Sequence, residues 1–408
     1  MIVLSGAELV LPDRILSPGT LVIDRGRIVD IRPGAVHTGS GFPFHGHYIV
    51  PGFIDVHVHG VEGVDSLQAG DAVSSIAARL TRYGVTAFCP TTVACSPEAL
   101  RRVLEQVRRA REAPAPGAAR VLPAHLESNF INPEYKGAQP AACLRSPRAA
   151  LDAWSRGGAP VTERRHGGLP FEAGHILREI EKAAPDVGIV TLAPELDCGL
   201  DLVAWLLSRG HRVSLGHSAA TYDEAMSAIA AGARHATHLF NRMPPLGHRS
   251  PGLAGAILQA EEVAAEIICD GFHVHPALVR TAVAAKGPSR VLAITDGTAA
   301  SGLPAGGTVS LGDETISIGE TAAFLRDGTL AGSVLTMDGA FRMLVERAGL
   351  SLVDAATLCA TTPARELGLV GYGVLALDSI ADVVILDQRL SVVQTYVGGQ
   401  LAYSRTQV

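Results

Sequence analysis

The stretch GFIDVHVHG, residues 52–60, is typical of a buried β-strand that ends in two histidines. Side chains alternate between the two faces of a strand, so His57 and His59 share one face. Similar apolar runs recur seven more times, and most are followed by a segment with helical spacing. These runs are GVTAFCPTT (84–92), RVLPAHLES (120–128), VGIVTLAPE (187–195), HRVSLGHS (211–218), ARHATHLF (233–240), VAAEIICDG (263–271) and RVLAITDG (290–297).

Eight strands that alternate with helices over about 300 residues predict a (β/α)₈ barrel, a TIM-like fold of the α/β class. Four intervening segments have helical spacing: residues 96–112, 171–184, 221–232 and 275–286. We expect Ser96 and Thr221 to cap two of these helices at their N-termini. The Gly-rich, strand-like residues 298–335 are predicted to form an excursion after the eighth barrel strand.

The two ends of the chain share a different pattern of short β-type runs broken by Gly, Pro and Asp. Residues 1–50 contain MIVLSGAELVL and GTLVIDRGRIVDI, and residues 373–403 contain GVLALDSIADVVILD and LSVVQTYVGGQLAY. This pattern predicts a small β-domain in which the two ends pair. We therefore predict a β-sandwich domain of residues 1–50 and 373–408 and a barrel domain of residues 51–372.

The composition indicates a protein that builds a large core. Hydrophobic residues make up 47% of the 408 residues, charged residues make up 18%, and the net charge is −6. That charge gives no electrostatic reason to expect nucleic acid or an anionic membrane as a partner. We expect neither a signal peptide, because MIVLSGAELVLPDR lacks a basic region, nor a membrane span. The six cysteines form no C-x-x-C pair, which favours reduced thiols in a cytoplasmic protein.

Residues that can bind a metal gather at the predicted strand ends. The carboxyl ends of barrel strands meet at one mouth, where barrel enzymes carry their chemistry. A single histidine there is more often a satisfied polar residue or a cap, but six such residues at one position argue against coincidence. Imidazoles and carboxylates are ligands for Zn²⁺ or for Fe, Mn or Co, so one or two divalent metals are expected. The six residues are His57, His59, Glu127, His217, His238 and Asp296.

Further motifs identify a family that the chain resembles. PGFIDVHVHG resembles the first-strand motif of the amidohydrolase superfamily. KGAQP, TLAPE, LGHS, THLFNRMPPLGHRSPGLAGAI, ICDGFHVHP, ITDG and LAGS are similar to motifs of N-acetylglucosamine-6-phosphate deacetylases. The resemblance covers nearly the whole chain, including the β-domain split between its ends.

The resemblance implies a role for each matching position. Three residues match the main metal ligands: Glu127, His217 and His238. His57 and His59 match a second metal position that some members lack. Asp296 matches the catalytic aspartate. The residues that match contacts to the sugar phosphate are Asn241, His273 and Arg249. The family's arginine at the position of Arg249 reaches the phosphate from the neighbouring subunit, which implies a homodimer.

Amide hydrolysis suits these residue types. A metal polarises the carbonyl group and lowers the pKa of bound water toward about 7. A carboxylate can take the proton of that water and pass it to the departing amine, the role expected of Asp296. Another reading of Asp296, as a cap or as one more metal ligand, does not exclude this role.

The chain departs from the family at several positions near the substrate. Family members usually have Gly-Pro where this chain has Ser128 and Asn129, and a histidine where it has Gln139. Gln139 can donate a hydrogen bond but cannot carry positive charge. The position after Asn241 is usually small and is Arg242 here. The segment 141–175 is longer than expected and brings Arg164, Arg165 and His166 near the altered loop.

The sequence is consistent with three functions. The first is a deacetylase of a phosphorylated N-acetyl amino sugar. The second is an amidohydrolase of the same fold that acts on another N-acyl or cyclic amide, whose anionic group would contact Arg242 and Arg249. The third is a non-catalytic binding protein, against which the intact metal and acid–base positions argue.

Overall fold

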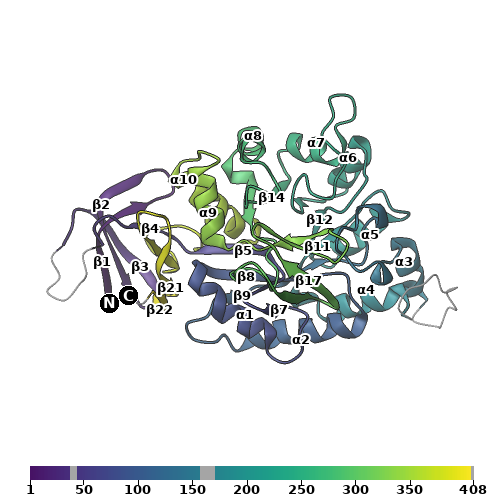
Figure 1. Ribbon diagram of the computed structural model, residues 1–408, viewed down its shortest axis with the longest axis horizontal. Coiled ribbons are helices and arrows are strands. Elements are labelled where there is room, and N and C mark those ends of the chain that lie inside the picture. Colours follow the sequence, from purple (N-terminus) through teal and green to yellow (C-terminus); the bar gives the residue numbers. More distant parts are fainter. Residues whose placement is uncertain (37–43, 157–170, 406–408) are drawn as a thin grey trace.

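The computed structural model describes residues 1–36, 44–156 and 171–405, and its centre is a parallel barrel (Figure 1). The strands follow one another in space as β5-β8-β10-β11-β12-β13-β14-β15, and each falls within a predicted run. The predicted barrel is therefore confirmed. Its strands are β5 (Phe53–Val58), β8 (Val85–Thr92), β10 (Ala124–Glu127), β11 (Val187–Leu192), β12 (Arg212–Leu215), β13 (His235–Ala236), β14 (Ala264–Ile268) and β15 (Val291–Ile294).

The barrel closes just beyond the strand ends, next to the predicted metal ligands. The backbone nitrogen of Asp296 donates to the carbonyl of His57 at 3.0 Å, and that of His59 donates to the carbonyl of Gly297 at 2.7 Å. A ninth short strand, β9 (Arg120–Val121), pairs with β8, and β6 (Gly60–Val61) pairs with β7 (Val64–Asp65). The residues that close the barrel thus also form its mouth.

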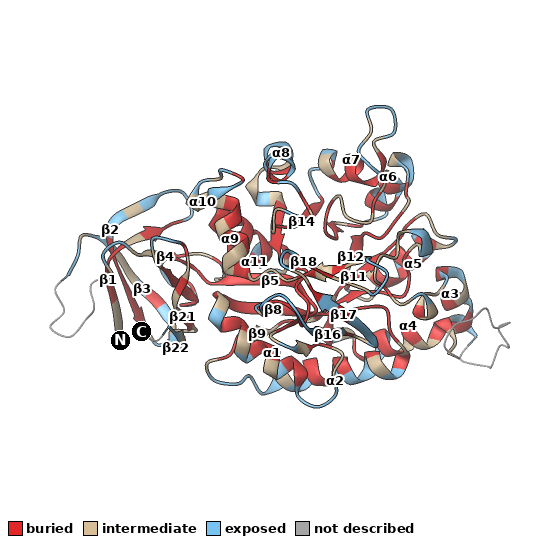
Figure 2. Ribbon diagram, in the orientation of Figure 1, coloured by how far each residue is buried: buried red, intermediate tan, exposed pale blue. Residues whose placement is uncertain are grey.

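Helices cover the outside of the barrel and bury one face each (Figure 2). In α2 the buried residues include Leu100, Val103, Leu104 and Val107, the spacing of a single helical stripe. The described helices are α1 (Ala72–Leu80), α2 (Pro97–Glu112), α3 (Pro147–Ser155), α4 (Ala173–Lys182), α5 (Gly199–Leu207), α6 (Tyr222–Ala230), α7 (Gly252–Gln259), α8 (Pro276–Lys286), α9 (Met337–Glu346), α10 (Leu352–Ala356) and α11 (Thr362–Glu366). In the described part of the chain, no helix combines the length and the apolar character needed to cross a bilayer.

Both predicted N-caps are confirmed. The Ser96 side chain accepts a hydrogen bond from the backbone of Ala99, which starts α2. Thr221 and Glu224 form a reciprocal capping box at the start of α6. The six cysteines are unpaired, and all but the half-buried Cys198 are buried, as expected of reduced thiols.

The two chain ends form one β-sheet at the left of Figure 1. Its order is β22-β21-β20-β4-β1-β2-β3, with β1 (Ile2–Val10), β2 (Ile15–Asp24), β3 (Arg27–Pro33), β4 (Tyr48–Pro51), β20 (Val383–Leu386), β21 (Val392–Val397) and β22 (Gln400–Ser404). The sheet curls so that the start of β3 meets the segment before β20. There the backbone nitrogen of Ile28 donates to the carbonyl of Ser379 at 3.0 Å. The predicted small β-domain is present, but one curled sheet replaces the two separate sheets of a sandwich.

The predicted excursion after the eighth strand is a four-stranded antiparallel sheet. It contains β16 (Thr308–Leu311), β17 (Glu314–Ile318), β18 (Ala322–Phe324) and β19 (Leu330–Ser333). Its last strand returns to the barrel mouth, where the backbone nitrogen of Ser333 donates to the carbonyl of Asp296 at 2.8 Å. The excursion therefore packs against the site rather than extending away from it.

Candidate metal centre and active site

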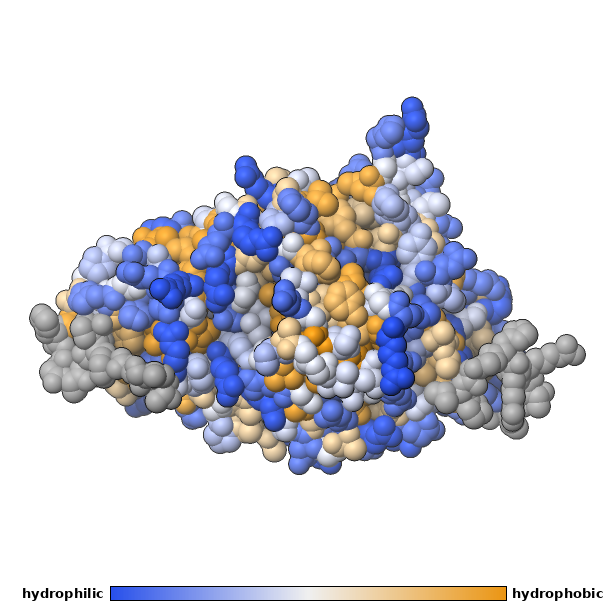
Figure 3. Space-filling view, in the orientation of Figure 1, coloured by the Kyte–Doolittle hydropathy of each residue, from blue (hydrophilic) through white to orange (hydrophobic). Residues whose placement is uncertain are grey.

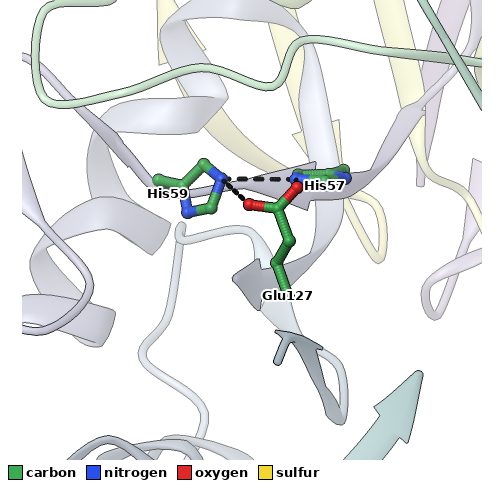
Figure 4. A group of neighbouring side chains, drawn as sticks. All are labelled: His57, His59 and Glu127. Carbon is green, nitrogen blue, oxygen red and sulfur yellow. Dashed lines mark hydrogen bonds and ion pairs between the residues drawn. The ribbon is translucent and has the colours of Figure 1, made fainter. Parts of the chain in front are cut away.

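The six residues singled out at the strand ends lie together at the barrel mouth. His57 lies in β5 and His59 follows that strand, and Glu127 ends β10. His217, His238 and Asp296 each lie two residues beyond the end of their strand. All six side chains are buried. Figure 4 shows His57, His59 and Glu127, with the His59 ring facing both of the other side chains.

Backbone geometry turns three of these side chains into the mouth. His217, His238 and Asp296 have φ angles of 47°, 29° and 48°. Residues other than glycine seldom adopt this left-handed region, which costs of order 1–3 kcal/mol per residue and is concentrated at functional sites. The residue two positions beyond the strand end therefore has the same strained backbone conformation after β12, β13 and β15.

The side chains of two histidines face one oxygen of Glu127. His217 Nδ1 lies 2.8 Å from the carbonyl of Tyr135. A carbonyl only accepts, so Nδ1 carries the hydrogen, and in the neutral ring Nε2 carries a lone pair. That lone pair faces Glu127 Oε1 at 2.9 Å, and His238 Nε2 lies 2.9 Å from the same oxygen and 3.0 Å from His217 Nε2. The ligand atoms of Glu127, His217 and His238 lie within 4.8 Å of one another, so the three residues fit a divalent metal.

A second group of candidate metal ligands adjoins the first. His57 Nδ1 lies 2.9 Å from Glu266 Oε2, so His57 donates there and turns Nε2 toward the mouth. That Nε2 lies 3.3 Å from His59 Nε2 and 3.4 Å from Asp296 Oδ1. His57, His59 and Glu127 have ligand atoms close enough to hold one ion. Glu127 thus belongs to both groups, and the site has room for one or two metals.

The charges in the site favour a bound cation. Burial opposes ionisation of Glu127, but His217 and the neighbouring histidines hold the pKa of its carboxyl well below the usual range. Burial would lower the pKa of His57, but the carboxylates of Glu266, Asp296 and Glu127 raise it to about 10. Burial also raises the pKa of Asp296, but the hydrogen bond from His59 and nearby imidazoles lower it below its ordinary value. The carboxylates stay ionised, and positive charge is stabilised among them.

Gln139 lies inside the site and contacts a predicted metal ligand. Its Nε2 donates to Glu127 Oε2, and its Oε1 accepts from the backbone of Ala94 at 2.7 Å. An amide nitrogen has two hydrogens, so one remains for another partner. Gln139 thus contacts Oε2 of the Glu127 carboxylate, whereas His217 and His238 face Oε1.

Ser128 and Asn129 do not line the cavity, although the sequence predicted that they lie near the substrate. Asn129 Nδ2 donates to the carbonyls of Cys95 and Cys143 at 2.8 and 2.7 Å, which uses both of its hydrogens. Ser128 Oγ donates to the carbonyl of Thr191 and accepts from the backbone of Phe130 at 3.1 Å. Both residues stabilise the loop after β10.

The metal centre forms one side of a cavity of about 400 Å³. Four predicted substrate residues line the cavity as well: Gln139, Asn241, Arg242 and His273. His273 Nδ1 donates to Asp270 Oδ2 at 2.6 Å, which orients its ring. Val93, Leu311 and Leu330 add apolar walls, and two of them come from the excursion. The cavity can therefore take a small molecule with one polar end at the metal site.

Arg242 is well placed for an anion and Arg249 is not, within this chain. Arg242 has a φ of 53°, and its guanidinium lies so close to Gly137 that a β-carbon there would approach its Cζ to 3.1 Å. Among the described residues it has no ion-pair partner. Arg249 is exposed and does not line the cavity. Its segment, before α7, projects from the body (Figure 1) with a hydrophilic tip (Figure 3). Arg164, Arg165 and His166 lie outside the described residues.

Sequence reasoning missed the polar residues beneath the metal site. Glu266, His125 and His235 are fully buried inside the barrel. His125 shares the face of Glu127, and Glu266 interrupts the apolar strand AAEII. A carboxylate inside a buried strand needs a partner, and this was the available signal.

A (β/α)₈ barrel whose mouth gathers four imidazoles and two carboxylates defines the class of metal-dependent amidohydrolases. The chain matches the amidohydrolase family over residues 48–402. It is 36% identical over 403 residues to the N-acetylglucosamine-6-phosphate deacetylase of Homo sapiens, covering 96% of this chain and 90% of the relative. The chain belongs to the N-acetylglucosamine-6-phosphate deacetylase family, and it is a hydrolytic enzyme acting on a non-peptide C–N bond.

Two further comparisons agree with this assignment. The chain is 35% identical over 357 residues to the N-acetylgalactosamine-6-phosphate deacetylase of Escherichia coli O157:H7, covering 87% of each. The fold of this chain is similar, with a TM-score of 0.85, to a solved structure from Mycobacterium smegmatis. That structure is a mutant of N-acetyl-D-glucosamine-6-phosphate deacetylase in complex with N-acetyl-D-glucosamine-6-phosphate. That structure is 31% identical, and the comparison covers 99% of each chain.

Proposed function

We propose that this enzyme removes the acyl group from a phosphorylated N-acetyl amino sugar. One observation carries the proposal: a single cavity is lined by the candidate metal ligands Glu127, His217 and His238 and also by Arg242 and His273, whose side chains can bind an anion. The first group suits an amide carbonyl and the second suits a phosphate. Relatives named for two different phosphorylated N-acetyl amino sugars support this substrate class.

The proposed metal ligands are Glu127, His217 and His238, with His57 and His59 completing a second position. Imidazole and carboxylate ligands suit Zn²⁺ best, and Fe, Mn or Co are alternatives. When bound, the metal would polarise the amide carbonyl and acidify a water molecule. Elemental analysis of the purified protein tests the proposal, and one or two divalent ions per chain are expected.

The proposed proton carrier is Asp296. Its carboxylate would take a proton from the attacking water as the new C–O bond forms at the amide carbon. It would then give that proton to the amine nitrogen as the C–N bond breaks, which leaves a free carboxylic acid and an amine. Asp296 Oδ1 lies 3.2 Å from His59 Nε2, so the carboxylate is held between the metal positions and the cavity.

Gln139 favours a second candidate within the same reaction class. It replaces a histidine of the family, and its contacts to Glu127 and Ala94 leave one hydrogen for the substrate. Losing a charged donor to a developing oxyanion typically costs about 10²–10³-fold in rate. The alternative substrate is another polar N-acyl or cyclic amide with an anionic group.

A substrate panel separates the two candidates. The first candidate predicts efficient turnover of a phosphorylated N-acetyl amino sugar, and the second predicts weak turnover of N-acetylglucosamine 6-phosphate and better turnover of a related anionic amide. The panel measures kcat/KM on phosphorylated and non-phosphorylated N-acyl amino sugars of both the gluco and galacto series and on cyclic amides. A kcat/KM of about 10⁵ M⁻¹s⁻¹ or more on N-acetylglucosamine 6-phosphate, within the ordinary range of enzymes, would exclude the second candidate.

We also propose a cytoplasmic homodimer in which Arg249 reaches the cavity of the partner. The exposed segment with Arg249 supports this, as do the exposed apolar side chains of Leu246, Phe272 and Leu278, since α7 and α8 lie on one side of the molecule (Figure 1). Light scattering of wild type and of Leu278→Asp tests the dimer. A wild-type monomer would contradict it.

A further inference from the structure

A carboxylate lies beneath the metal centre, in the interior of the barrel. Glu266 is in the middle of β14, and its side chain is fully buried. The strand is otherwise apolar, so Glu266 contributes no packing that a leucine would not supply better. A buried charge is retained at a cost unless its oxygens are bound by donors.

Both oxygens of Glu266 are used by residues of the metal centre and its floor. Oε2 accepts from His57 Nδ1 at 2.9 Å and from the backbone nitrogen of His238 at 3.3 Å. Oε1 accepts from His235 Nε2 at 2.9 Å. Glu266 therefore contacts one residue from each metal position. One of its contacts is to the strained backbone of His238, whose φ is 29°.

The direction of the His57 hydrogen bond follows from the surroundings of Glu266. Its Oε2 also accepts from the backbone nitrogen of His238, and its Oε1 faces His235 Nε2, so the carboxylate is surrounded by donors and acts as the acceptor. His57 must then carry a hydrogen on Nδ1, and its Nε2 is left to face His59 and Asp296. The opposite tautomer would place a lone pair against the carboxylate.

His125 is held mainly by other partners and does not replace His57 as the donor to Glu266. Its Nδ1 lies 3.1 Å from the carbonyl of Val56, and its Nε2 lies 2.8 Å from Thr191 Oγ1. Its Nδ1 also lies 3.5 Å from Glu266 Oε1, farther than the 2.9 Å at which His57 and His235 approach the carboxylate. The negative charge is therefore directed mainly at His57 and His235.

We propose that Glu266 is a positioning residue of the metal centre, which fixes the tautomer and ring orientation of His57 so that Nε2 serves as a ligand. The inference rests on the proposed metal site. Partners of this kind typically change metal affinity by 10–100-fold when they are removed. Glu266 would thereby determine whether the second metal position is filled.

The test compares Zn²⁺ binding by metal-free wild type, Glu266→Gln, His57→Ala and the double variant, titrated against a competing chelator. We expect Glu266→Gln to weaken one Zn²⁺ position by roughly 10–100-fold. In the His57→Ala background the same change should add little, because the proposed effect passes through His57. Wild-type affinity in Glu266→Gln, or an equal loss in both backgrounds, would overturn the proposal.

Asp55→Asn is the matched control for loss of a buried negative charge. Asp55 is fully buried on β5, which β15 separates from β14, and it accepts from Thr295 Oγ1 at 2.6 Å and from the backbone nitrogen of His57 at 3.2 Å. Among the described residues, no imidazole side chain donates to it. This variant should keep both Zn²⁺ positions, and loss of the His57 position in it would overturn the specific role of Glu266.

A measurement on the wild type tests the proposal even if Glu266→Gln does not fold. Nitrogen-15 NMR of the histidine rings should show a hydrogen on His57 Nδ1 with and without Zn²⁺, and a bare Nδ1 would overturn the proposal. Absence of Zn²⁺ binding would instead contradict the proposed metal centre, so the two failures remain distinct.

Discussion

Asp296 combines a strained backbone, a buried carboxylate and a place at the seam where the barrel closes. Its backbone nitrogen donates to His57 and its carbonyl accepts from Ser333, so the main chain is held independently of the side chain. We predict that Asp296→Asn reduces turnover by roughly 10²–10⁴-fold, the usual contribution of general acid–base assistance. Single-turnover and steady-state assays on the best substrate of the panel measure this.

The same variant should keep its fold and most of its metal. Asn fills the same volume and leaves the backbone hydrogen bonds unchanged. Circular dichroism and elemental analysis provide the control, since a loss of activity that merely followed a loss of metal would assign Asp296 to metal binding instead. Retention of most of the wild-type rate would remove Asp296 from the mechanism.

Arg242 and Arg249 can be separated because only Arg242 lines the cavity of its own chain. We predict that Arg242→Ala lowers kcat/KM on the phosphorylated substrate by roughly 10–100-fold, the value of a hydrogen bond to a charged group. Activity on the matching non-phosphorylated compound should change little. Arg249→Ala is the matched control, since its effect should depend on dimer formation and vanish in a monomeric variant. Equal losses on both substrates would show that Arg242 does not read the anion.

Among the elements, β19 has the closest link to the chemistry. Gly332 in this strand has a φ of 65°, and a β-carbon there would lie 2.9 Å from the carbonyl oxygen of Asp296 and 2.6 Å from Thr298 Cγ2. The excursion therefore supports the proposed proton carrier through a glycine that permits close backbone approach.

Replacing that glycine should damage catalysis more than folding. Gly332→Ala is predicted to displace Asp296 and to lower kcat at least tenfold, because misplacement of a reacting group by about 1 Å can cost about 10²-fold. Gly328→Ala is the matched control: its φ is 84°, but nothing lies within 4 Å of the added carbon. Gly332→Ala should lose more stability than Gly328→Ala in thermal unfolding because of these close contacts, so kcat is compared at a temperature at which both variants are folded. Equal kcat values would contradict the role assigned to β19.

The barrel strands were predictable because each is a short apolar run bounded by turn residues, and Ser96 and Thr221 had the chemistry of N-caps. The grouping of the candidate metal ligands was predictable because parallel strands end at one mouth. The positions of Ser128 and Asn129 were not predictable. Their side chains bind backbone carbonyls of segments distant in sequence, such as those at Cys95 and Thr191, which no local pattern reveals. The curl of the terminal sheet likewise depends on contacts between residues far apart in the chain.

At the scale of the whole molecule, the proposed metal connects strands from both halves of the barrel. Its ligands come from β5, β10, β12 and β13 or their ends. A ligand that binds only the folded state at 100 times its dissociation constant adds about 2.7 kcal/mol of stability. For a chain of this length that corresponds to a rise in Tm of about 3 °C.

Chelation should therefore lower both Tm and activity, and Zn²⁺, Mn²⁺ or Co²⁺ should restore both. Scanning calorimetry and activity assays on the same samples measure the two effects. A protein without bound metal that gains neither stability nor activity from any of these ions would contradict the proposed centre. Mg²⁺ is the control, since histidine-rich sites bind it poorly.

The sheet built from both chain ends has a consequence for synthesis on the ribosome. Strand β4 lies between β1 and β20 in that sheet, and residue 383, where β20 begins, is made long after residue 51. At about 5–20 residues per second, β4 waits roughly 15–70 s for its partner. During that time its hydrogen-bonding edge is open to other chains. A messenger that ends before β20 would leave the edge exposed permanently, so truncated products of this protein are expected to aggregate.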